Sequence, residues 1–444
     1  MVNDRSRSNV EFGRRAFLKR SAAALCAPAL VPARLLGGRG VVAPSDRIGL
    51  ACIGVGSMGS GHLRSFLGYE DVRIVAVCDV REEHRLRARE RVDRRYGDGA
   101  CATYSDYREL LERPDIDAVC IAVPDHWHVL IGLEAARRGV DMYYEKPLGM
   151  SVAEDIAMRE AVNRYGVVFH FGTQQRSDDR FRLACELVRN GRIGELRTVM
   201  IGSANYKQIP MPPPQPVPPG FDYDMWLGPA PWAPYTFERC TRQWTLIRDY
   251  SLGCVSGAWG IHHVDIAQWA IGADGTGPIE VEGSGTFPEQ GLYDTAIAWE
   301  VEHRYANGVR LIHMDMPTAL TRAPQFKLHW MGILFLGSEG WVYVCREMIA
   351  TQPESLVKTS FGEGDLLLPR SRDHHRTFLD AVRSRRQTLC PIETAVRSDS
   401  VCQQADIAMR LGRRLFWDPS AERFVDDAGA NRLLSRPMRA PWHV

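Results

Sequence analysis

This sequence of 444 residues lacks several features, and each absence narrows its function. The formal net charge is only +1, so no global field attracts nucleic acid or an anionic membrane. The eleven cysteines are scattered without a CxxC pair, so we expect few or no disulfides and no metal site built from them. The remaining composition, 45% hydrophobic and 25% charged, is typical of a soluble globular protein, and the length predicts two domains.

The first residues carry a pattern typical of an export signal. Arg14 and Arg15 are adjacent and precede Phe17 and Leu18, and a short stretch rich in alanine and leucine follows. This stretch is shorter than the roughly 20 residues of a membrane span, so no membrane anchor is expected. Residues 1–35 therefore resemble a twin-arginine signal peptide. We expect the twin-arginine export machinery as a partner and a periplasmic or secreted location.

The clearest motif is a glycine-rich turn that follows the first strong strand signal. Residues 47–53 form a continuous apolar run of the kind buried in a parallel sheet, and the sequence then reads GVGSMG. In a strand–turn–helix unit, Gly54 would permit the tight turn, Gly56 would admit a pyrophosphate to the backbone and Gly59 would allow close helix packing. The order predicts a dinucleotide site with its phosphates at the helix N-terminus.

The end of the next strand bears on the choice of dinucleotide. VRIVAVCDV predicts a second buried strand that ends in Asp79, and a carboxylate there bonds the adenosine ribose and repels a 2′-phosphate. NAD is therefore favoured as the cofactor. Arg81 lies two residues further on and could offset the repulsion, so NADP stays open.

Strand and helix patterns alternate as far as about residue 170. DAVCIAV, VDMYYEK and VVFHFGT predict further buried strands, separated by helices over about 127–138 and 152–165. This order predicts an α/β domain with a doubly wound parallel sheet over residues 46–172.

The pattern changes in residues 173–444. A proline-dense segment at 209–220 is expected to be extended, and period-two alternation then predicts an antiparallel sheet with one face covered. Helices near 374–384 and 393–412 are expected to pack back onto the body. We therefore predict a second, α+β domain that binds the substrate.

Two short motifs follow strands of the parallel sheet at their carboxyl ends, where ligands bind in open α/β sheets. VPDHWH contains Asp125, His126 and His128, and YYEKPL contains Glu145 and Lys146. Lys146 at this place can reach over a nicotinamide ring and bond a reacting hydroxyl or help remove its proton. The alternative is an exposed ion-pair lysine, but the position at a strand end favours function.

A second candidate acid–base group lies in GAWGIHHVDIAQW. The pattern predicts a helix from about His262 to Ile271, in which His262 and Asp265 share one face. His263 points about 100° away and is expected to pack or to support the site. Adjacent histidines on a helix cannot easily share one ion, so we expect no metal here. We predict that His262 is a general acid or base.

These motifs together resemble the glucose–fructose oxidoreductase/inositol dehydrogenase (Gfo/Idh/MocA) family, particularly its exported twin-arginine branch. The resemblance covers nearly the whole chain through GVGSMG, PDHWHVLIGLEAARRGVDMYYEKPL, GTQQRS, WLGPAPWAPY, DYSLG, WGIHHVDIAQWAIG and the closing LFWDPSAERFVDDAGANRLLSRPMRAPW. It implies an N-terminal Rossmann domain and a C-terminal domain with an open, largely antiparallel sheet. It also implies hydride transfer between NAD(P) and a sugar, polyol or glycoside, and self-association as a homo-oligomer.

The resemblance assigns roles by position within these motifs. Lys146 and His262 match the family's catalytic lysine and histidine, and Asp265 matches an acid that touches substrate. The other residues expected at the substrate are His263, Gln175, Arg176 and Tyr250. The residues expected at the cofactor are Gly54, Gly56, Ser57, Met58, Gly59, Asp79, Pro124, His128, Glu145, Lys146 and Gln174.

One position departs from the family pattern. The pattern is often Asp-x-Gly-x-His-x-x-Asp, and Ala258 stands here at the position of the first acid. Loss of a positioned acid–base group usually costs a factor of about 10²–10⁴ in rate. Three outcomes stay open: Lys146 and His262 suffice, Asp249 or Tyr250 substitutes, or the chemistry has changed.

Three functions fit these residues. The first is an exported NAD-dependent oxidoreductase acting on a ring hydroxyl of a sugar, polyol or glycoside. Outside the cytoplasm there is no evident pool of free NAD, which motivates the second, a redox-neutral glycoside-cleaving or epimerising enzyme with tightly bound NAD. The third is a sugar- or NAD-binding homologue without catalysis, which Ala258 favours and which the intact Lys146 and His262 oppose.

Overall fold

The computed structural model describes residue 43 and residues 46–444. The predicted signal peptide over residues 1–35 lies outside them. Residues 48–444 form one compact unit, which contains both sheets of the protein. In this part of the chain the cysteines are free, and no helix is long and apolar enough to cross a bilayer.

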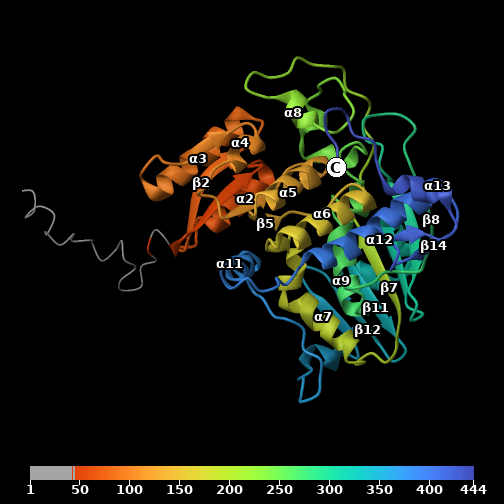
Figure 1. Cartoon of the computed structure of the whole chain (residues 1–444). Coiled ribbons are helices and arrows are strands. Elements are labelled where there is room, and N and C mark those ends of the chain that lie inside the picture. Colours follow the sequence, from red (N-terminus) through yellow and green to blue (C-terminus); the bar gives the residue numbers. More distant parts are fainter. Residues whose placement is uncertain (1–42, 44–45) are drawn as a thin grey trace, which may run out of the picture. The chain divides into compact units, whose positions relative to one another are not determined.

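The first sheet has six strands, all paired in parallel (Figure 1). The order is β3-β2-β1-β4-β5-β6. Every residue of β1 is buried, because helices cover both faces and leave no polar side of the strand. The predicted doubly wound parallel sheet is therefore confirmed. Its strands are β1 (Ile48–Ile53), β2 (Val72–Cys78), β3 (Ala102–Tyr104), β4 (Ala118–Ile121), β5 (Asp141–Tyr144) and β6 (Phe169–Phe171).

Helices cover the two faces of this sheet in two groups. One apolar cluster includes residues of α5 (His128–Arg137) and α6 (Val152–Tyr165), and another includes residues of α2 (Ser57–Phe66) and α3 (Glu82–Tyr96). The short helix α4 (Tyr107–Leu111) joins the first cluster. The bounds of α6 are those predicted, because Ser151 caps its first turn and Gly166 ends it in the left-handed conformation.

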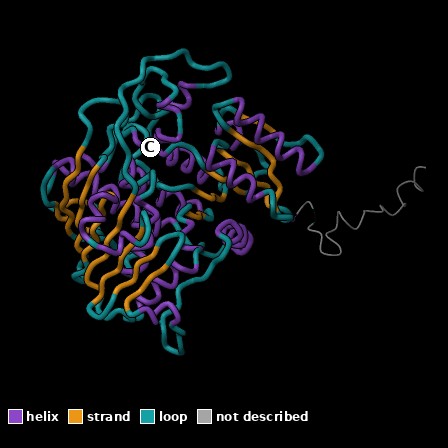
Figure 2. Tube along the Cα trace, turned by 180° about the vertical axis from the view of Figure 1, so that it is seen from behind, coloured by secondary structure: helices purple, strands orange, loops and turns teal. Residues whose placement is uncertain are grey.

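The second sheet has nine strands in the order β13-β12-β11-β7-β10-β9-β8-β14-β15. Only β7 and β10 pair in parallel, so the prediction of a largely antiparallel sheet is confirmed. In Figure 2 its strands run side by side as orange tubes. They are β7 (Leu196–Ser203), β8 (Glu280–Thr286), β9 (Ala298–Arg304), β10 (Arg310–Asp315), β11 (Gly332–Gly337), β12 (Trp341–Val344), β13 (Ile349–Gln352), β14 (Leu415–Asp418) and β15 (Arg423–Phe424).

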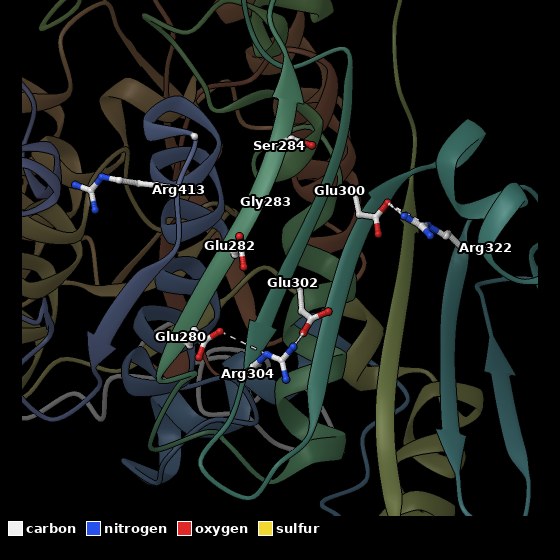
Figure 3. A pocket seen from close by; sticks show the side chains of 10 residues that line it. Glu280, Glu282, Gly283, Ser284, Glu300, Glu302, Arg304, Arg322 and Arg413 are labelled. Carbon is white, nitrogen blue, oxygen red and sulfur yellow. Dashed lines mark hydrogen bonds and ion pairs between the residues drawn. The ribbon is translucent and has the colours of Figure 1, made fainter.

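Three helices cover one face of the second sheet. They are α7 (Asp179–Arg189), α9 (Gly260–Ile271) and α12 (Ile392–Leu411), and α12 is buried along most of its length. On the opposite face, β8 and β9 present alternating acidic side chains beside arginines. A hollow of about 440 Å³ lies on this face. Arg304 pairs there with Glu280 and Glu302, and Arg322 pairs with Glu300 (Figure 3). This part of the sheet is open, as predicted.

The C-terminal part of the chain returns to the first sheet. In α11 (His374–Ser384), Phe378 and Leu379 join the apolar cluster that contains α2 and β1. Arg376 on the same helix donates to the carboxylate of Asp71 at 2.9 Å. The remaining short elements are α8 (Tyr223–Leu227), α10 (Met316–Arg322) and α13 (Ala428–Asn431). The proline-dense segment at 209–220 contains neither helix nor strand and ends in a turn.

Asp315 provides a test of how the second sheet is held together. Its buried carboxylate accepts from Trp299 N at 2.8 Å and from Thr318 Oγ1 at 2.8 Å. Asp315→Ala should lower the free energy of unfolding by about 3 kcal/mol, because a buried N–H loses its charged acceptor. Chemical denaturation followed by circular dichroism measures the change. Asp380→Ala, which removes an exposed ion pair with Arg376, is the control and should change stability by under about 1 kcal/mol.

Candidate active site

The glycine loop has the geometry of a dinucleotide cradle. Gly54 has φ +79°, and a Cβ there would overlap the backbone carbonyl oxygen of Ala122. A Cβ at Gly59 would overlap the carbonyl oxygen of Gly54. A Cβ at Gly56 would meet only His84 at 3.6 Å, so a ligand can approach the backbone there. No side chain caps the N-terminus of α2, and its first-turn amides stay available to an anion. The loop therefore fits a pyrophosphate.

Asp79 is fixed at the end of β2, where the sequence places it. Its Oδ2 accepts from Val55 N at 2.9 Å and from His84 Nδ1 at 3.2 Å, and its Oδ1 accepts from Arg81 N at 2.9 Å. The Arg81 guanidinium carbon lies 3.8 Å from the centre of the Phe221 ring, which follows the proline-dense segment. A carboxylate oxygen has more than one lone pair, so Asp79 keeps the capacity to accept from ribose hydroxyls. This geometry fits NAD.

Lys146 lies at one end of the first sheet, and His262 lies in the helix α9. Lys146 follows β5, and its Nζ donates to the carbonyl oxygen of Gly257, in the turn before α9, at 2.8 Å. His262 is buried, and its Nδ1 has no hydrogen-bond partner among the described residues. Burial, with the positive charges of Lys146 and Arg346, holds the pKa of His262 well below its usual range. The imidazole is therefore neutral at pH 7 and able to accept a proton.

Glu145 lies under Lys146 in a buried network. Its Oε1 interacts with His62 Nε2 at 2.9 Å and accepts from Gln174 Nε2 at 2.7 Å. His62 Nδ1 in turn lies 2.8 Å from Nε2 of His375 on α11. Burial raises the pKa of Glu145, but the interactions with His62 and Lys146 outweigh it and bring the pKa to about 2. An ionised Glu145 thus fixes the backbone from which Lys146 projects.

Asp125 stands beside the same turn. A side chain at Gly257 would overlap its Oδ2, which has no hydrogen-bond partner in the described part of the chain. Burial raises the pKa of Asp125 to about 7, against the opposing effects of Lys146 and Ser251. The sequence identified Asp125 only as a member of its motif. Its closeness to Gly257 depends on chain segments more than 130 residues apart, so no local signal indicated it.

Asp265 and Arg176 were expected at the substrate, and the structure pairs them with each other instead. Arg176 Nε donates to Asp265 Oδ2 at 2.8 Å and its Nη2 donates to Oδ1 at 2.9 Å. Asp274 also accepts from Arg176, at 2.7 Å, and Ser398 Oγ donates to Asp265 at 3.0 Å. Both members are buried. With their hydrogen-bonding groups occupied, we interpret them as structural residues that orient α9.

Two further predicted site residues are also engaged by protein groups. His128 lies between the carbonyl oxygens of Pro147 at 2.6 Å and Val123 at 2.9 Å, and so ties the two strand-end motifs together rather than facing a ligand. The Tyr250 hydroxyl accepts from Arg239 at 3.1 Å inside an aromatic cluster. Burial raises its pKa to about 12.

His263 and Gln175 support the residues around them. His263 Nε2 accepts from Trp259 Nε1 at 3.2 Å, which confines the imidazole to the interior. With its amide oriented to pair donors with acceptors, Gln175 donates to the carbonyl oxygen of His262 at 2.9 Å and accepts from Arg346 Nε at 3.3 Å. Gln175 thereby connects the first turn of α9 to an arginine that the sequence did not indicate.

The remaining predicted residues keep at least partial exposure. Ser57 and Met58 are exposed on the first turn of α2, and Pro124, Lys146 and Gln174 are partly exposed at strand ends. Three further residues that the sequence did not propose for ligand contact are also partly exposed: Ala258, Trp259 and Arg346. Trp259 contacts the ring of His262, and the Arg346 guanidinium lies over the Trp259 ring. Lys146 connects the strand-end motif to the turn before α9.

Together, the fold and the site define a protein of the dinucleotide-dependent oxidoreductase class, with one parallel and one largely antiparallel sheet. Residues 48–173 match the oxidoreductase family's NAD-binding Rossmann fold, and residues 204–444 match its C-terminal alpha/beta domain. The chain belongs to the Gfo/Idh/MocA oxidoreductase family.

Curated relatives match part of the chain. Myo-inositol 2-dehydrogenase of Thermotoga maritima is 30% identical over 168 residues, which is 38% of this chain and 47% of that protein. An alpha-N-acetylgalactosaminidase of Shewanella oneidensis is 32% identical over 167 residues, 35% of each chain. The matches thus span half the length of these relatives or less. Among solved structures, GenD2 from gentamicin A biosynthesis, in complex with NAD, has the same fold, with a TM-score of 0.60 and 19% identity over 84% of this chain and 97% of that chain.

The glycine loop predicts a sharp difference between two glycines of α2. Gly59→Ala should abolish NAD binding, because its Cβ would overlap the Gly54 carbonyl oxygen and displace the loop. Gly61→Ala should bind NAD as the wild type does, since nothing lies within 4 Å of a Cβ there. Calorimetric titration with NAD measures both. Equal affinities would contradict the assignment of the cradle.

The pairing of Asp265 with Arg176 predicts a loss of stability rather than of substrate contact. Asp265→Ala should lower the free energy of unfolding by about 3–5 kcal/mol, because it leaves a buried guanidinium without its principal partner. Asp274→Ala removes the more exposed of the two acids and should cost less. Denaturant titration measures both variants. A stable Asp265→Ala protein with a raised KM would instead support substrate contact.

Proposed function

We propose that the chain is an NAD-dependent oxidoreductase that transfers hydride between nicotinamide and a ring hydroxyl of a sugar, polyol or glycoside. The observation that carries the proposal is the hydrogen bond from Lys146 Nζ to Gly257 O, which brings the strand-end lysine to the turn that begins the His262 helix. A cationic donor and a neutral imidazole thus belong to one site beside the dinucleotide loop.

The residues have complementary roles in this proposal. The Lys146 ammonium donates a hydrogen bond to the reacting hydroxyl oxygen and stabilises the negative charge that develops there. The neutral His262 accepts the hydroxyl proton, and its low pKa favours later release of that proton. NAD, when bound, supplies the hydride acceptor. Asp125 acts as a positioning residue, because its carboxylate packs against Gly257 and lies in the field of Lys146.

A redox-neutral reaction is the second candidate. The matching relatives include an alpha-N-acetylgalactosaminidase and other proteins of glycosyl hydrolase family 109 as well as a dehydrogenase. We also propose export by the twin-arginine route, on the strength of Arg14 and Arg15 and the apolar stretch after them. A protein outside the cytoplasm needs a retained cofactor, which favours transient oxidation followed by cleavage or epimerisation and re-reduction.

We further propose two domains, a cofactor domain over 46–172 and a substrate domain over 173–444. The family matches at 48–173 and 204–444 support this division. The open face of β8 and β9 supports self-association, since exposed sheet surface of this kind can pair between copies.

The function is tested with the full chain on a panel of sugars, polyols and glycosides. Lys146→Met and His262→Ala should each lower kcat by about 10²–10⁴ while NAD binding is retained, because each removes a positioned proton donor or acceptor. Lys207→Met, at an exposed lysine, should leave kcat unchanged. A kcat that neither Lys146→Met nor His262→Ala lowers would reject the proposal.

The same assay separates the two candidate reactions. Net NADH formation, followed by absorbance, identifies a dehydrogenase. Release of a cleaved or epimerised product without net NADH identifies a redox-neutral enzyme. Mass analysis of the denatured protein, purified from the compartment where it resides, shows whether a nicotinamide cofactor travels with it.

A further inference from the structure

Arg346 is a partly buried cation beside the candidate active site, without an ion pair among the described residues. It lies two positions after the end of β12, and its charge acts on His262 and His263. Burial lowers its pKa, and three acids oppose this effect from a distance: Glu347, Glu145 and Asp178. Its charge is therefore incompletely compensated by the protein.

Each of these three acids is already paired with another cationic or imidazole group. Glu145 lies 2.9 Å from His62, Asp178 lies 2.6 Å from Arg180, and Glu347 lies 3.6 Å from His329. The contrast with Arg176 is informative, because that buried guanidinium contacts two carboxylates. Leaving a guanidinium without an anion in a partly desolvated place costs free energy unless a ligand supplies the charge.

The Arg346 side chain is also held in place. Its guanidinium carbon lies 4.5 Å from the centre of the Trp259 ring, and its Nε donates to Gln175 Oε1 at 3.3 Å. Stacking and the Nε hydrogen bond fix the plane of the guanidinium, while no described residue accepts from its Nη groups. An ordered guanidinium with a free edge suits bidentate binding of a carboxylate or phosphate.

The same contacts connect this arginine to the reacting groups. The Trp259 ring lies 5.6 Å from the ring of His262, and Gln175 joins Arg346 to the backbone of His262. Lys146 bonds to Gly257, two residues before Trp259. A ligand that reaches Lys146 and His262 is therefore within a short distance of Arg346.

We propose that Arg346 is an anion-binding residue of the substrate site, and that the substrate is a sugar or glycoside with an anionic substituent. The shared chemistry is a carboxylate, as in a sugar acid, or a phosphate ester. The inference rests on the proposed function, since it specifies the substrate class of that same site. Trp259 and Gln175 are its positioning residues.

The test measures binding as well as turnover in the NAD-loaded full chain. The probes are D-glucuronate and D-galacturonate, D-glucose 6-phosphate, and the neutral sugars D-glucose and D-galactose. Arg346→Gln should raise the Kd of the preferred anionic probe, relative to the Kd of the matched neutral sugar, about 10- to 100-fold, as expected for loss of a charge-assisted pair. The Kd of the anionic probe for Arg346→Lys should lie between those of the wild type and of Arg346→Gln, because lysine keeps the positive charge and loses the planar guanidinium. The comparison of uronates with the phosphate ester identifies the anion.

Arg413→Gln, on the open face of the second sheet in Figure 3, is the matched control and should behave as the wild type. Thermal melting checks that each variant is folded. Equal binding of neutral and anionic probes, no binding of any anionic probe, or an Arg346→Gln variant with unchanged anion affinity would each overturn the inference. Lys146-dependent turnover without an anion preference would leave the proposed function intact. Anion binding that depends on Arg346, together with turnover that does not depend on Lys146, would support the anion site and reject the proposed function.

Discussion

The hydrogen bond between Lys146 and Gly257 is the contact on which the candidate active site depends. It joins the loop after β5 to the turn before α9 at 2.8 Å. The C-terminal helix α12 reinforces it, because Asp399 accepts from Leu148 N at 3.0 Å and from Ser256 Oγ at 3.2 Å. One buried carboxylate thus ties the loop and the turn together, and neither half of the sequence contains the site by itself.

Two of the carboxyl groups around this contact, those of Asp125 and Asp399, are buried. Burial raises the pKa of Asp399 to about 7, and Asp125 beside Gly257 has a similar value for the same reason. Hydrogen bonds to such buried groups are strong in a medium of low polarity, and a buried polar group without a partner lowers stability. The buried carboxylates therefore fix the relative positions of Lys146 and α9 more rigidly than apolar packing would, at some expense in stability.

Local patterns predicted the fold and the motifs, but they did not predict which side chains meet. The apolar run before Gly54 specified β1, and the Ser151 cap with Gly166 specified both ends of α6. The strand-end position of Lys146 also followed from chain order. In contrast, no local pattern indicated that Arg176 and Asp265, both expected at the substrate, pair with each other across 89 positions. His62 and Arg346 were not indicated, and the closeness of Asp125 to Gly257 was not predicted, because their partners lie on distant segments. Helical or strand periodicity carries no information about such pairs.

The alanine at position 258 affects the charge distribution of the candidate site. Lys146 and Arg346 both lower the pKa of His262, so the site is biased toward positive potential. An aspartate at 258 would add a negative charge next to Trp259, on which the Arg346 guanidinium rests. That charge would compete with an anionic substituent for Arg346 and repel it. With Ala258 the cation stays free for the substrate, while Asp125, on the other side of Gly257, supplies the carboxylate near Lys146 from a position shielded by burial. Ala258 is therefore compatible with the proposed anion-binding role of Arg346.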